Sequence, residues 1–517
     1  MANARLFRSL VGALIPNRDA RNEAGGPAYR LPPSHALAQF AATGCLNTTF
    51  YASAELQLER VLGLSTRVTP EFLAKTAIYC RERGHMKDMP ALLLAALSRR
   101  DPTLMDRAFD RVVDSPRMLR TFVQIVRSGA TGRKSLGTAP KRCVRRWLDQ
   151  RTDAALFAAS VGNAPSLVDI VKMVHPKPNT PQRQALFGYL MGRDVVRESL
   201  PPLVQQFESF KAGDRSDVPD VPFQMLTAAG LTRREWARVA RRASWQTTRM
   251  NLNTFARHGV FDESQMTDLV SARLRDASEI ARARVFPYQL LAAFRTADRA
   301  VPAKVRAALE DAMELAIANV PSIDGQVYVC PDVSGSMRSP VTGHRTGATT
   351  TVRCVDAAAL VTAAIVRRNP TAEVLPFEQS VVPLRLSARD SVMTNADRLA
   401  SVGGGGTSVS APLAALNARK AKGDLVVIVS DNESWVDAAG SRGTAALREW
   451  NVFRARNPRA RLVLIDLQPY GTTQAIERDD ILNVGGFSDH VFEIVSEFAA
   501  GRLTSGRWIE RIESVVL

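Results

Sequence analysis

Three separated motifs supply oxygen atoms that could bind a small, hard cation. The motif DxSxS (Asp332, Ser334 and Ser336) follows directly after the apolar run 327–330, Thr407 follows the glycine run 403–406, and Asp431 follows the apolar run 425–430. Carboxylate and hydroxyl oxygens are the ligands that Mg²⁺ prefers, together with retained waters. We therefore predict a divalent metal site, with Mg²⁺ as the expected ion, formed by Asp332, Ser334, Ser336, Thr407 and Asp431. Such a set could leave one coordination position for an acidic group of a partner.

The alternative for DxSxS alone is a surface turn that caps a helix, but the order of all three motifs favours the metal site. No other motif in the chain indicates catalysis. The six histidines are scattered without an HExxH pattern, and the sequence contains neither GxSxG nor a Walker loop. The acidic pair Asp479-Asp480 is expected to be a solvated loop. We therefore predict that the protein is not an enzyme.

The elements that position the metal motifs alternate between strand and helix. Apolar runs predict strands at 327–330, 372–377, 381–386, 425–429 and 460–465, and helices are predicted at 352–367, 412–420 and 444–456. This alternation is typical of a doubly wound, mostly parallel α/β sheet. Ligands of such sheets bind at the carboxyl ends of the strands, where all three motifs are expected to lie.

Residues 31–320 are predicted to form helix after helix, with strand-like alternation nearly absent. Helices of roughly ten to eighteen residues are separated by turns at 178–181 and 212–222. An array of helical hairpins of the HEAT kind is the natural architecture for so long a helical stretch. We predict three parts: an N-terminal segment 1–20, in which 1–15 is a surface helix rather than a signal peptide, a helical-repeat domain 21–320, and an α/β domain 321–517.

The positive charge of the chain is confined to the helical part. The whole chain has 68 Lys or Arg and 51 Asp or Glu, and residues 321–517 hold 21 of each, which leaves 47 basic and 30 acidic residues in 1–320. Such an excess favours an anionic partner, nucleic acid before membrane, although an arginine-rich soluble surface is the alternative. The densest basic stretch flanks a glycine turn at 137–140 and contains Arg133, Lys134, Lys141, Arg142, Arg145 and Arg146. Further candidate patches are Arg81, Arg83 and Lys87, and the arginines of 233–242.

Cysteine usage and hydropathy indicate the compartment. The five cysteines are widely spaced and form no CxxC pair, which favours reduced thiols in a cytoplasmic protein. No apolar run is long enough for a membrane helix. We therefore expect a cytoplasmic protein without a membrane partner.

A basic helical array followed by a domain with these metal motifs resembles the Ro autoantigen (TROVE-domain) family, with a C-terminal von Willebrand factor A (vWA) domain. The similarity runs in order along nearly the whole chain. It is carried by NEAGGPAY (22–29), NTTFY (47–51), RGHMKDMPAL (83–92), PSLVDIVKMVHPK (165–177), RVFPYQLL (284–291) and ILNVGGFSD (481–489). In this family the DxSxS motif belongs to a metal-ion-dependent adhesion site (MIDAS).

The resemblance implies a ring of HEAT-like helices closed by the vWA domain. It further implies a scaffold for RNA quality control, which holds a small noncoding Y RNA on its outer surface and single-stranded 3′ ends of misfolded RNAs in a basic central hole. Association with an exoribonuclease is also implied. His175 matches a histidine important for Y RNA binding, and Lys172 of the same helix is included in the expected RNA site. The alternative for His175 is a helix cap before Pro176.

Two departures from the family affect these expectations. The stretch 158–162 carries no basic residue where relatives have Lys and Arg, and the polar loop 338–351 is longer than in animal relatives.

Three functions stay open: an RNA-binding ring, a protein adaptor whose metal takes a partner carboxylate, and a metal-dependent hydrolase. The lack of a recognisable general base near the metal motif disfavours the hydrolase.

Overall fold

The computed structural model describes residues 15–283, 287–317, 320, 322–344, 352–437, 443–486, 489–502 and 507–517. Residues 1–14 of the predicted N-terminal helix and residues 345–351 of the long loop at 338–351 lie outside the described residues. The predicted fold class is confirmed: a helical array precedes an α/β domain with a parallel central sheet. Within the described residues, no helix is both long and apolar enough to cross a membrane.

The helical array begins with a run of short helices that start at strong capping residues. Ser and Thr side chains accept the backbone N–H of the third helical residue at Thr69, Ser115 and Thr180, each followed by a proline in the first turn. The helices are α1 (Pro33–Thr43), α2 (Ala54–Arg67), α3 (Pro70–Glu82), α4 (Asp88–Arg100), α5 (Pro102–Val112), α6 (Pro116–Arg127), α7 (Thr138–Asp149), α8 (Asp153–Ala159), α9 (Leu167–Val174), α10 (Pro181–Leu190), α11 (Pro202–Lys211), α12 (Arg233–Arg242), α13 (Trp245–Met250), α14 (Leu252–Arg257), α15 (Met266–Leu274), α16 (Ala277–Ala283), α17 (Pro287–Thr296) and α18 (Ala303–Ala316). Short 3₁₀ turns lie at Arg197–Ser199, Phe223–Met225, Thr227–Ala229 and Val260–Asp262.

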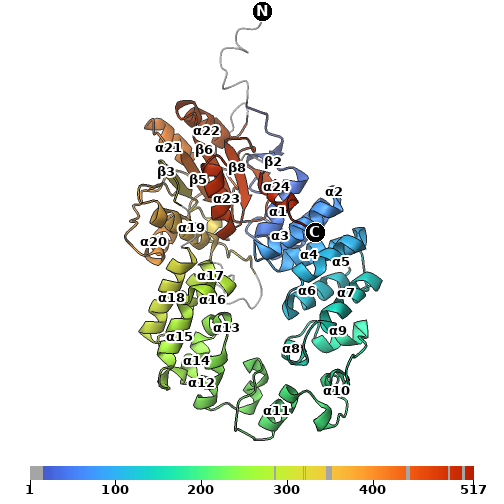
Figure 1. The fold of residues 1–517 in the computed structure, drawn as a ribbon. Helices are drawn as coiled ribbons and strands as arrows, with labels where there is room; N and C mark the ends of the chain where they lie inside the picture. Colours follow the sequence, from blue (N-terminus) through green and yellow to red (C-terminus); the bar gives the residue numbers. More distant parts are fainter. Residues whose placement is uncertain are drawn as a thin grey trace, which may run out of the picture.

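The array curves away from the α/β domain and returns to it, so that the chain closes into a ring (Figure 1). At its start, α1 contacts β8 (Ile481–Gly485), and the C-terminal helix α24 (Arg507–Glu513) packs on α1 and α3. At its end, α17 contacts α19 (Cys354–Arg368), and α18 contacts α20 (Val392–Ala400). Both ends of the array are therefore anchored on the α/β domain.

The central sheet has the order β4-β3-β5-β6-β8 with parallel neighbours. Its strands are β3 (Val327–Pro331), β4 (Glu373–Val374), β5 (Leu425–Ser430), β6 (Arg461–Asp466) and β8. Alternate residues of β5 separate into two cores: Val427 belongs to the core that includes α19 and α23 (Asp489–Ala499), and Ile428 to the one with α21 (Ala411–Ala418) and α22 (Ala445–Arg456). Helices therefore cover both faces of the sheet, which explains the continuous apolar strands.

Several predicted elements were wrong or missed. The predicted strand at 381–386 does not form; Pro383 lies in its middle, and proline has no N–H for a sheet ladder. The predicted strand at 372–377 is shortened to Glu373–Val374. The strand β8 and helix α20 were not assigned. Also missed was a small antiparallel sheet, in which β2 (Pro27–Arg30) pairs with β1 (Ala20–Arg21) and with β7 (Thr472–Thr473). The N-terminal strands thus dock on the α/β domain.

Candidate functional site

The DxSxS loop begins where β3 ends, and its aspartate is fully buried. Asp332 Oδ1 accepts the backbone N–H of Ser334 at 2.8 Å, and its Oδ2 accepts the hydroxyl of Ser430 at 2.5 Å. The hydroxyl oxygens of Ser334 and Ser336 lie 3.3 Å apart. Ser430, the last residue of β5, was not predicted as part of the site. It was hidden because the sequence does not show that β3 and β5 are adjacent.

Asp431, directly after β5, faces the same loop. The Ser336 side chain hydrogen-bonds to Asp431, and the Glu433 backbone N–H donates to its Oδ1 at 3.3 Å. Burial raises the pKa of both Asp332 and Asp431, and for Asp332 the negative charge of Asp431 raises it further. Two carboxylates are therefore buried close to each other at one edge of the sheet.

The glycine run brings Thr407 to this edge. The Gly335 N–H donates to the Gly405 carbonyl at 2.8 Å. Gly403 has φ of +78°, and a Cβ there would lie 2.3 Å from the Val333 carbonyl oxygen, so only glycine allows the loop to approach so closely. Thr407 is 1% exposed, and its carbonyl accepts the Trp435 N–H at 3.2 Å.

The oxygens gathered here suit a hard divalent cation. Neither Asp332 nor Asp431 is paired with a cationic side chain in the described part of the chain, and a buried, uncompensated pair of carboxylates is unfavourable. Within the described residues, no group of three or more His, Cys, Asp or Glu side chains is arranged to hold a metal. A cation at this edge would therefore depend on the hydroxyls of Ser334, Ser336 and Thr407 as well as on the two aspartates.

A cavity of about 330 Å³ opens beside the DxSxS loop, and the ring contributes to its wall. It is lined by Glu23, Ala24, Phe50, Tyr51, Gly335, Ser336, Gly405, Thr407 and Trp435. The Tyr51 hydroxyl is hydrogen-bonded to Ser336. Phe50 and Trp435 are 57% and 52% exposed, which is high for large apolar side chains. Sequence reasoning did not predict these aromatic residues as part of the site, although Phe50 and Tyr51 belong to the string NTTFY.

Residues 22–24, at the start of the helical-repeat domain, contact the adjoining loop after β5. The Asn22 side chain donates to the Ser434 carbonyl at 2.7 Å, and the Ala24 N–H donates to Glu433 Oε2 at 3.1 Å. Glu433 is fully buried, and burial, followed by the charge of Asp431, raises its pKa. The loop that carries Asp431 is therefore tied directly to the start of the ring.

The predicted basic stretch lies on α7 and on the loop before it. The residues predicted to form a flexible turn at 137–140 instead begin α7, with Gly137 as the N-cap at φ of +70° and Pro140 in the first turn. Lys134 is exposed, and Lys141 is half-buried. By contrast, Arg142 and Arg146 are bound to Asp106, at 3.1 Å and 2.6 Å. Part of the predicted positive charge is therefore neutralised.

Three of the remaining predicted RNA residues, Arg145, Lys172 and His175, lie at or near the C-terminal end of α9. His175 is the C-cap of this helix, in the left-handed conformation with φ of +48°, and its side chain is exposed. Arg145 of α7 donates to the Val174 carbonyl at 2.5 Å, which brings α7 against this helix end. Lys172 is exposed one turn earlier. Arg133 differs, since its guanidinium donates inward to the Ser98 carbonyl at 2.8 Å.

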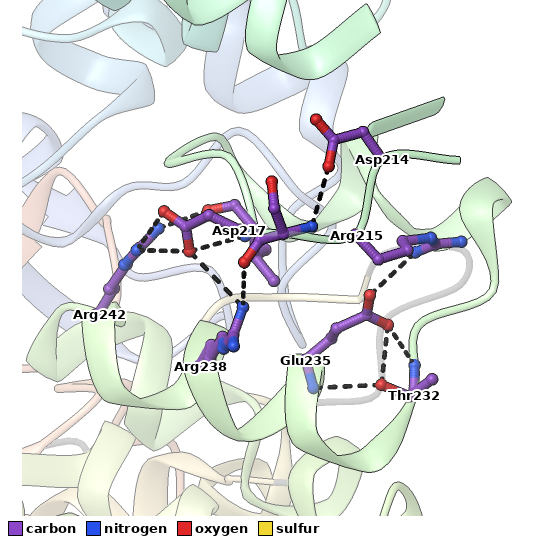
Figure 2. A network of polar contacts seen from close by, with 9 residues as sticks. Asp214, Arg215, Asp217, Thr232, Glu235, Arg238 and Arg242 are labelled. Atoms are coloured by element: carbon purple, nitrogen blue, oxygen red, sulfur yellow. Dashed lines mark hydrogen bonds and ion pairs between the residues drawn. The ribbon is translucent and has the colours of Figure 1, made fainter. Parts of the chain in front are cut away.

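The arginines of α12 are largely engaged with acidic residues. Asp217 pairs with Arg238 at 3.7 Å and with Arg242 at 3.2 Å. Figure 2 shows these contacts, together with those of Glu235 to Arg215 and to the capping Thr232. Such a network is typical of a solvated helix face. It leaves this candidate patch less suited to phosphate contacts than the exposed lysines near α7.

Arg81 and Lys87 of the candidate patch Arg81, Arg83 and Lys87 line a cavity of about 410 Å³ between the two arms of the ring, and Arg83 is not part of its wall. Its walls are Arg81, His85, Lys87 and Asp114 from the first arm, and Gln246, Arg282, Ala283 and Gln289 from the second. Arg81 is bound to Asp114 at 2.8 Å. Cationic and amide side chains from distant parts of the sequence thus face one space. Their proximity could not be predicted, because it depends on closure of the ring.

Comparisons with known proteins match this architecture. Residues 326–499 match the sequence model of the Ro60 vWA domain. The chain is 25% identical to the RNA-binding protein RO60 of Deinococcus radiodurans over 95% of this chain and 97% of that protein, and 24% identical to the RNA-binding protein RO60 of Caenorhabditis elegans over 47% of this chain and 38% of that protein. The crystal structure of the Deinococcus radiodurans RO (RSR) protein superposes with a TM-score of 0.59 at 21% identity, covering 91% of this chain and all of that chain.

Proposed function

We propose that this chain is a Ro-type RNA-binding scaffold, because residues 326–499 match the Ro60 vWA domain and the chain is similar over 95% of its length to a protein named RNA-binding protein RO60. The observation that carries the proposal is the similarity, over 95% of the chain, to a protein named for RNA binding. The confinement of the basic excess to residues 1–320 supports it, because phosphate neutralisation supplies much of the affinity for RNA. The proposed role is binding without catalysis, in the cytoplasm.

For the outer surface we propose a small structured RNA of the Y type as the ligand. Lys134, Lys141 and Lys172 would contact phosphates. The exposed imidazole of His175 could stack on a base or contact a phosphate at the helix end that Arg145 holds in place. Arg142 and Arg146 contribute less, since Asp106 shares their charge.

For single-stranded 3′ ends of misfolded RNAs we propose the cavity between the ring's arms. Lys87 supplies positive charge, and Arg81 and Arg282 contribute less, since Asp114 and Glu279 share their charge. Gln246 and Gln289 supply amide groups that can read unstacked bases. An exoribonuclease that acts on these ends is a proposed partner. Together these assignments describe a ribonucleoprotein in RNA quality control and processing.

At the vWA domain we propose a bound divalent cation, with Mg²⁺ as the expected ion, held by Asp332, Ser334, Ser336, Thr407 and Asp431. A cation there would offset the charge of the two buried carboxylates and supply a Lewis-acidic position for an anionic ligand. The residues of this chain orient that position: Ser430 fixes Asp332, and Ser336 hydrogen-bonds to Asp431.

The second candidate function is a protein adaptor, in which a partner carboxylate binds this cation. The cavity of about 330 Å³ beside Ser336 favours it, because Phe50 and Trp435 form an exposed aromatic rim where a side chain of the partner could pack. The two functions are compatible, since the candidate RNA surfaces belong to other parts of the ring.

The proposal is tested by RNA-binding titrations at several salt concentrations, with a duplex that carries a single-stranded 3′ tail. Wild type is compared with a variant in which Lys134, Lys141 and Lys172 are changed to Ala. The salt slope of log K is expected to become shallower by about 2 to 3, because each lost phosphate contact removes about 0.7 for a single strand and about 0.9 for a duplex. Arg459→Ala, at an exposed position of the vWA domain, is the control for loss of charge. Binding that is weak and indifferent to salt would reject the proposal.

A further inference from the structure

A pocket of about 500 Å³ lies between α2, the end of α4 and the loop from α6 to α7. It is lined by Leu62, Ser65, Thr66, Ala96, Arg99, Arg100, Ala130, Thr131 and Gly132. The volume falls within the range of small-molecule sites. Two arginines and no acidic side chain belong to the lining, so that the pocket suits an anionic ligand. We refer to it below as the α2–α4 pocket.

The two arginines have different roles. Arg100 is bound to the end of α2: it donates to the carbonyls of Ser65 and Val68, the latter at 2.9 Å. Arg99 is exposed and forms no ion pair within the described part of the chain. The guanidinium of Arg99 is therefore available for a ligand, while Arg100 keeps the wall in place.

The backbone of the loop opposite Arg99 lies directly against the Arg99 guanidinium at Gly132. Gly132 has φ of +79°, and a Cβ at this position would lie 1.8 Å from Nη1 of Arg99. The positive φ favours glycine at this position, and the absence of a Cβ lets the exposed Arg99 guanidinium lie directly against the loop backbone. Arg133, the next residue, anchors the loop to the Ser98 carbonyl, at the end of α4.

The hydroxyl of Thr131 gives independent evidence for a ligand. Thr131 lines the pocket and is 9% exposed, and its Oγ1 has no hydrogen-bond partner in the described part of the chain. Buried hydroxyls are normally paired, because an unpaired one loses its hydrogen bonds to water without replacement. The oxygen is itself shielded from solvent, so a rotation of the Thr131 side chain toward the pocket would let its hydroxyl donate to an anionic oxygen held by Arg99.

We propose that the α2–α4 pocket binds the phosphate of one nucleotide. Arg99 and the Thr131 hydroxyl contact the phosphate, and the sugar and base lie against the apolar side chains of Leu62 and Ala96. Lys134, exposed on the same loop, strengthens the positive potential at the entrance. The favoured source is a nucleotide of bound RNA, which rests on the proposed RNA binding. A free mononucleotide has the same chemistry.

The test measures binding of two probes, a single-stranded RNA by fluorescence anisotropy and adenosine 5′-monophosphate by calorimetry, to the full-length protein. The variants are Arg99→Gln and Thr131→Val, with Arg459→Gln as the control for a lost arginine charge. Each pocket variant is expected to weaken binding about tenfold, because charged hydrogen bonds to phosphate are strong. Thr131→Val is also expected to leave the melting temperature unchanged or raised, since it removes an unpaired buried hydroxyl. A purely structural threonine would behave in the opposite way.

The outcomes separate the source of the ligand and the two proposals. Weaker RNA binding in both variants, without binding of the mononucleotide, supports the pocket with RNA as the source. Mononucleotide binding that both variants lose supports the pocket with a free nucleotide. If wild type binds RNA and both variants match Arg459→Gln with both probes, the pocket is rejected and the RNA-binding function stands. If wild type binds neither probe, both proposals fail.

Discussion

Ser430 donates its hydroxyl to Oδ2 of Asp332 over 2.5 Å, across the adjacent ends of β5 and β3. The hydroxyl oxygen of Ser430 in turn accepts the Asn432 N–H at 2.9 Å. Ser430 therefore fixes the orientation of the buried aspartate and also the backbone that follows Asp431. It supports the proposed cation site without itself belonging to the predicted ligand set.

The first prediction concerns this support. Ser430→Ala is expected to weaken divalent-cation binding by about 10- to 100-fold, the usual effect of losing a residue that orients a metal ligand. Calorimetric titration with Mg²⁺ or Mn²⁺ measures the effect. Ser401→Ala, at an exposed serine whose hydroxyl bonds only its own helix end at 2.7 Å, is the control. Equal affinities in both variants would show that Asp332 does not depend on Ser430.

The second prediction concerns pH. Burial, and next the charge of Asp431, raises the pKa of Asp466 well above its ordinary value. The folded state therefore keeps this proton to a higher pH than the unfolded state, so stability falls as pH rises above about 4. The Asp466→Asn variant lacks this pH-dependent contribution to the free energy of unfolding, because asparagine does not titrate. Relative to wild type, the variant is expected to gain up to about 1.4 kcal/mol for each pH unit within that window.

Denaturant unfolding in EDTA between about pH 5 and about pH 8 checks this expectation. EDTA removes divalent cations, which would otherwise change the charge near Asp431. Asp220→Asn is the control, since Asp220 is exposed. A difference between Asp466→Asn and wild type that stays constant over this range contradicts the prediction.

Elements and motifs defined by neighbouring residues could be predicted from the sequence. Contacts between residues far apart in the chain could not. The strand β5 was predicted because LVVIV is apolar without interruption, as a strand covered on both faces requires. Asp332 and Asp431 were predicted to lie together because each follows such a strand, and Thr407 was added because a glycine run precedes it. Tyr51 escaped prediction because its contact with Ser336 joins residues 285 positions apart, and no local pattern records it.

The charges of the chain show the same contrast between what the sequence predicts and what depends on packing. The basic excess in residues 1–320 was visible in the sequence, but its distribution over free and paired side chains was not. Asp106 lies on α5, and its contacts with Arg142 and Arg146 of α7 depend on how the helices pack. Asp480, predicted to be solvated, is instead 3% exposed and accepts the Trp450 indole N–H at 2.7 Å.

The third prediction concerns Asp106, which neutralises part of the charge of Arg142 and Arg146. Burial alone would raise its pKa, but hydrogen bonds from Cys143 and Arg146 and the charges of Arg146 and Arg142 lower it, so the carboxylate is ionised at neutral pH. Asp106→Asn is expected to release Arg142, while Arg146 keeps its ion pair with Asp110 at 3.1 Å, and to increase RNA affinity about threefold with a steeper salt dependence. Asp268→Asn removes an equal charge from the pair with Lys304 and is the control. Equal RNA affinities of the two variants would mean that α7 does not contact RNA.

The fourth prediction separates the two roles of His175. At φ of +48° this residue occupies the left-handed conformation that glycine adopts more readily, so His175→Gly is expected to stabilise the end of α9 by up to about 1 kcal/mol. The same change removes the exposed imidazole and is expected to weaken binding of a structured RNA. Gln265→Gly, at an exposed residue with φ of +64°, offers the same backbone relief away from the proposed RNA surface. Thermal unfolding and RNA titration of both variants decide the matter: a histidine that only caps the helix would give two stabilised proteins with unchanged RNA binding.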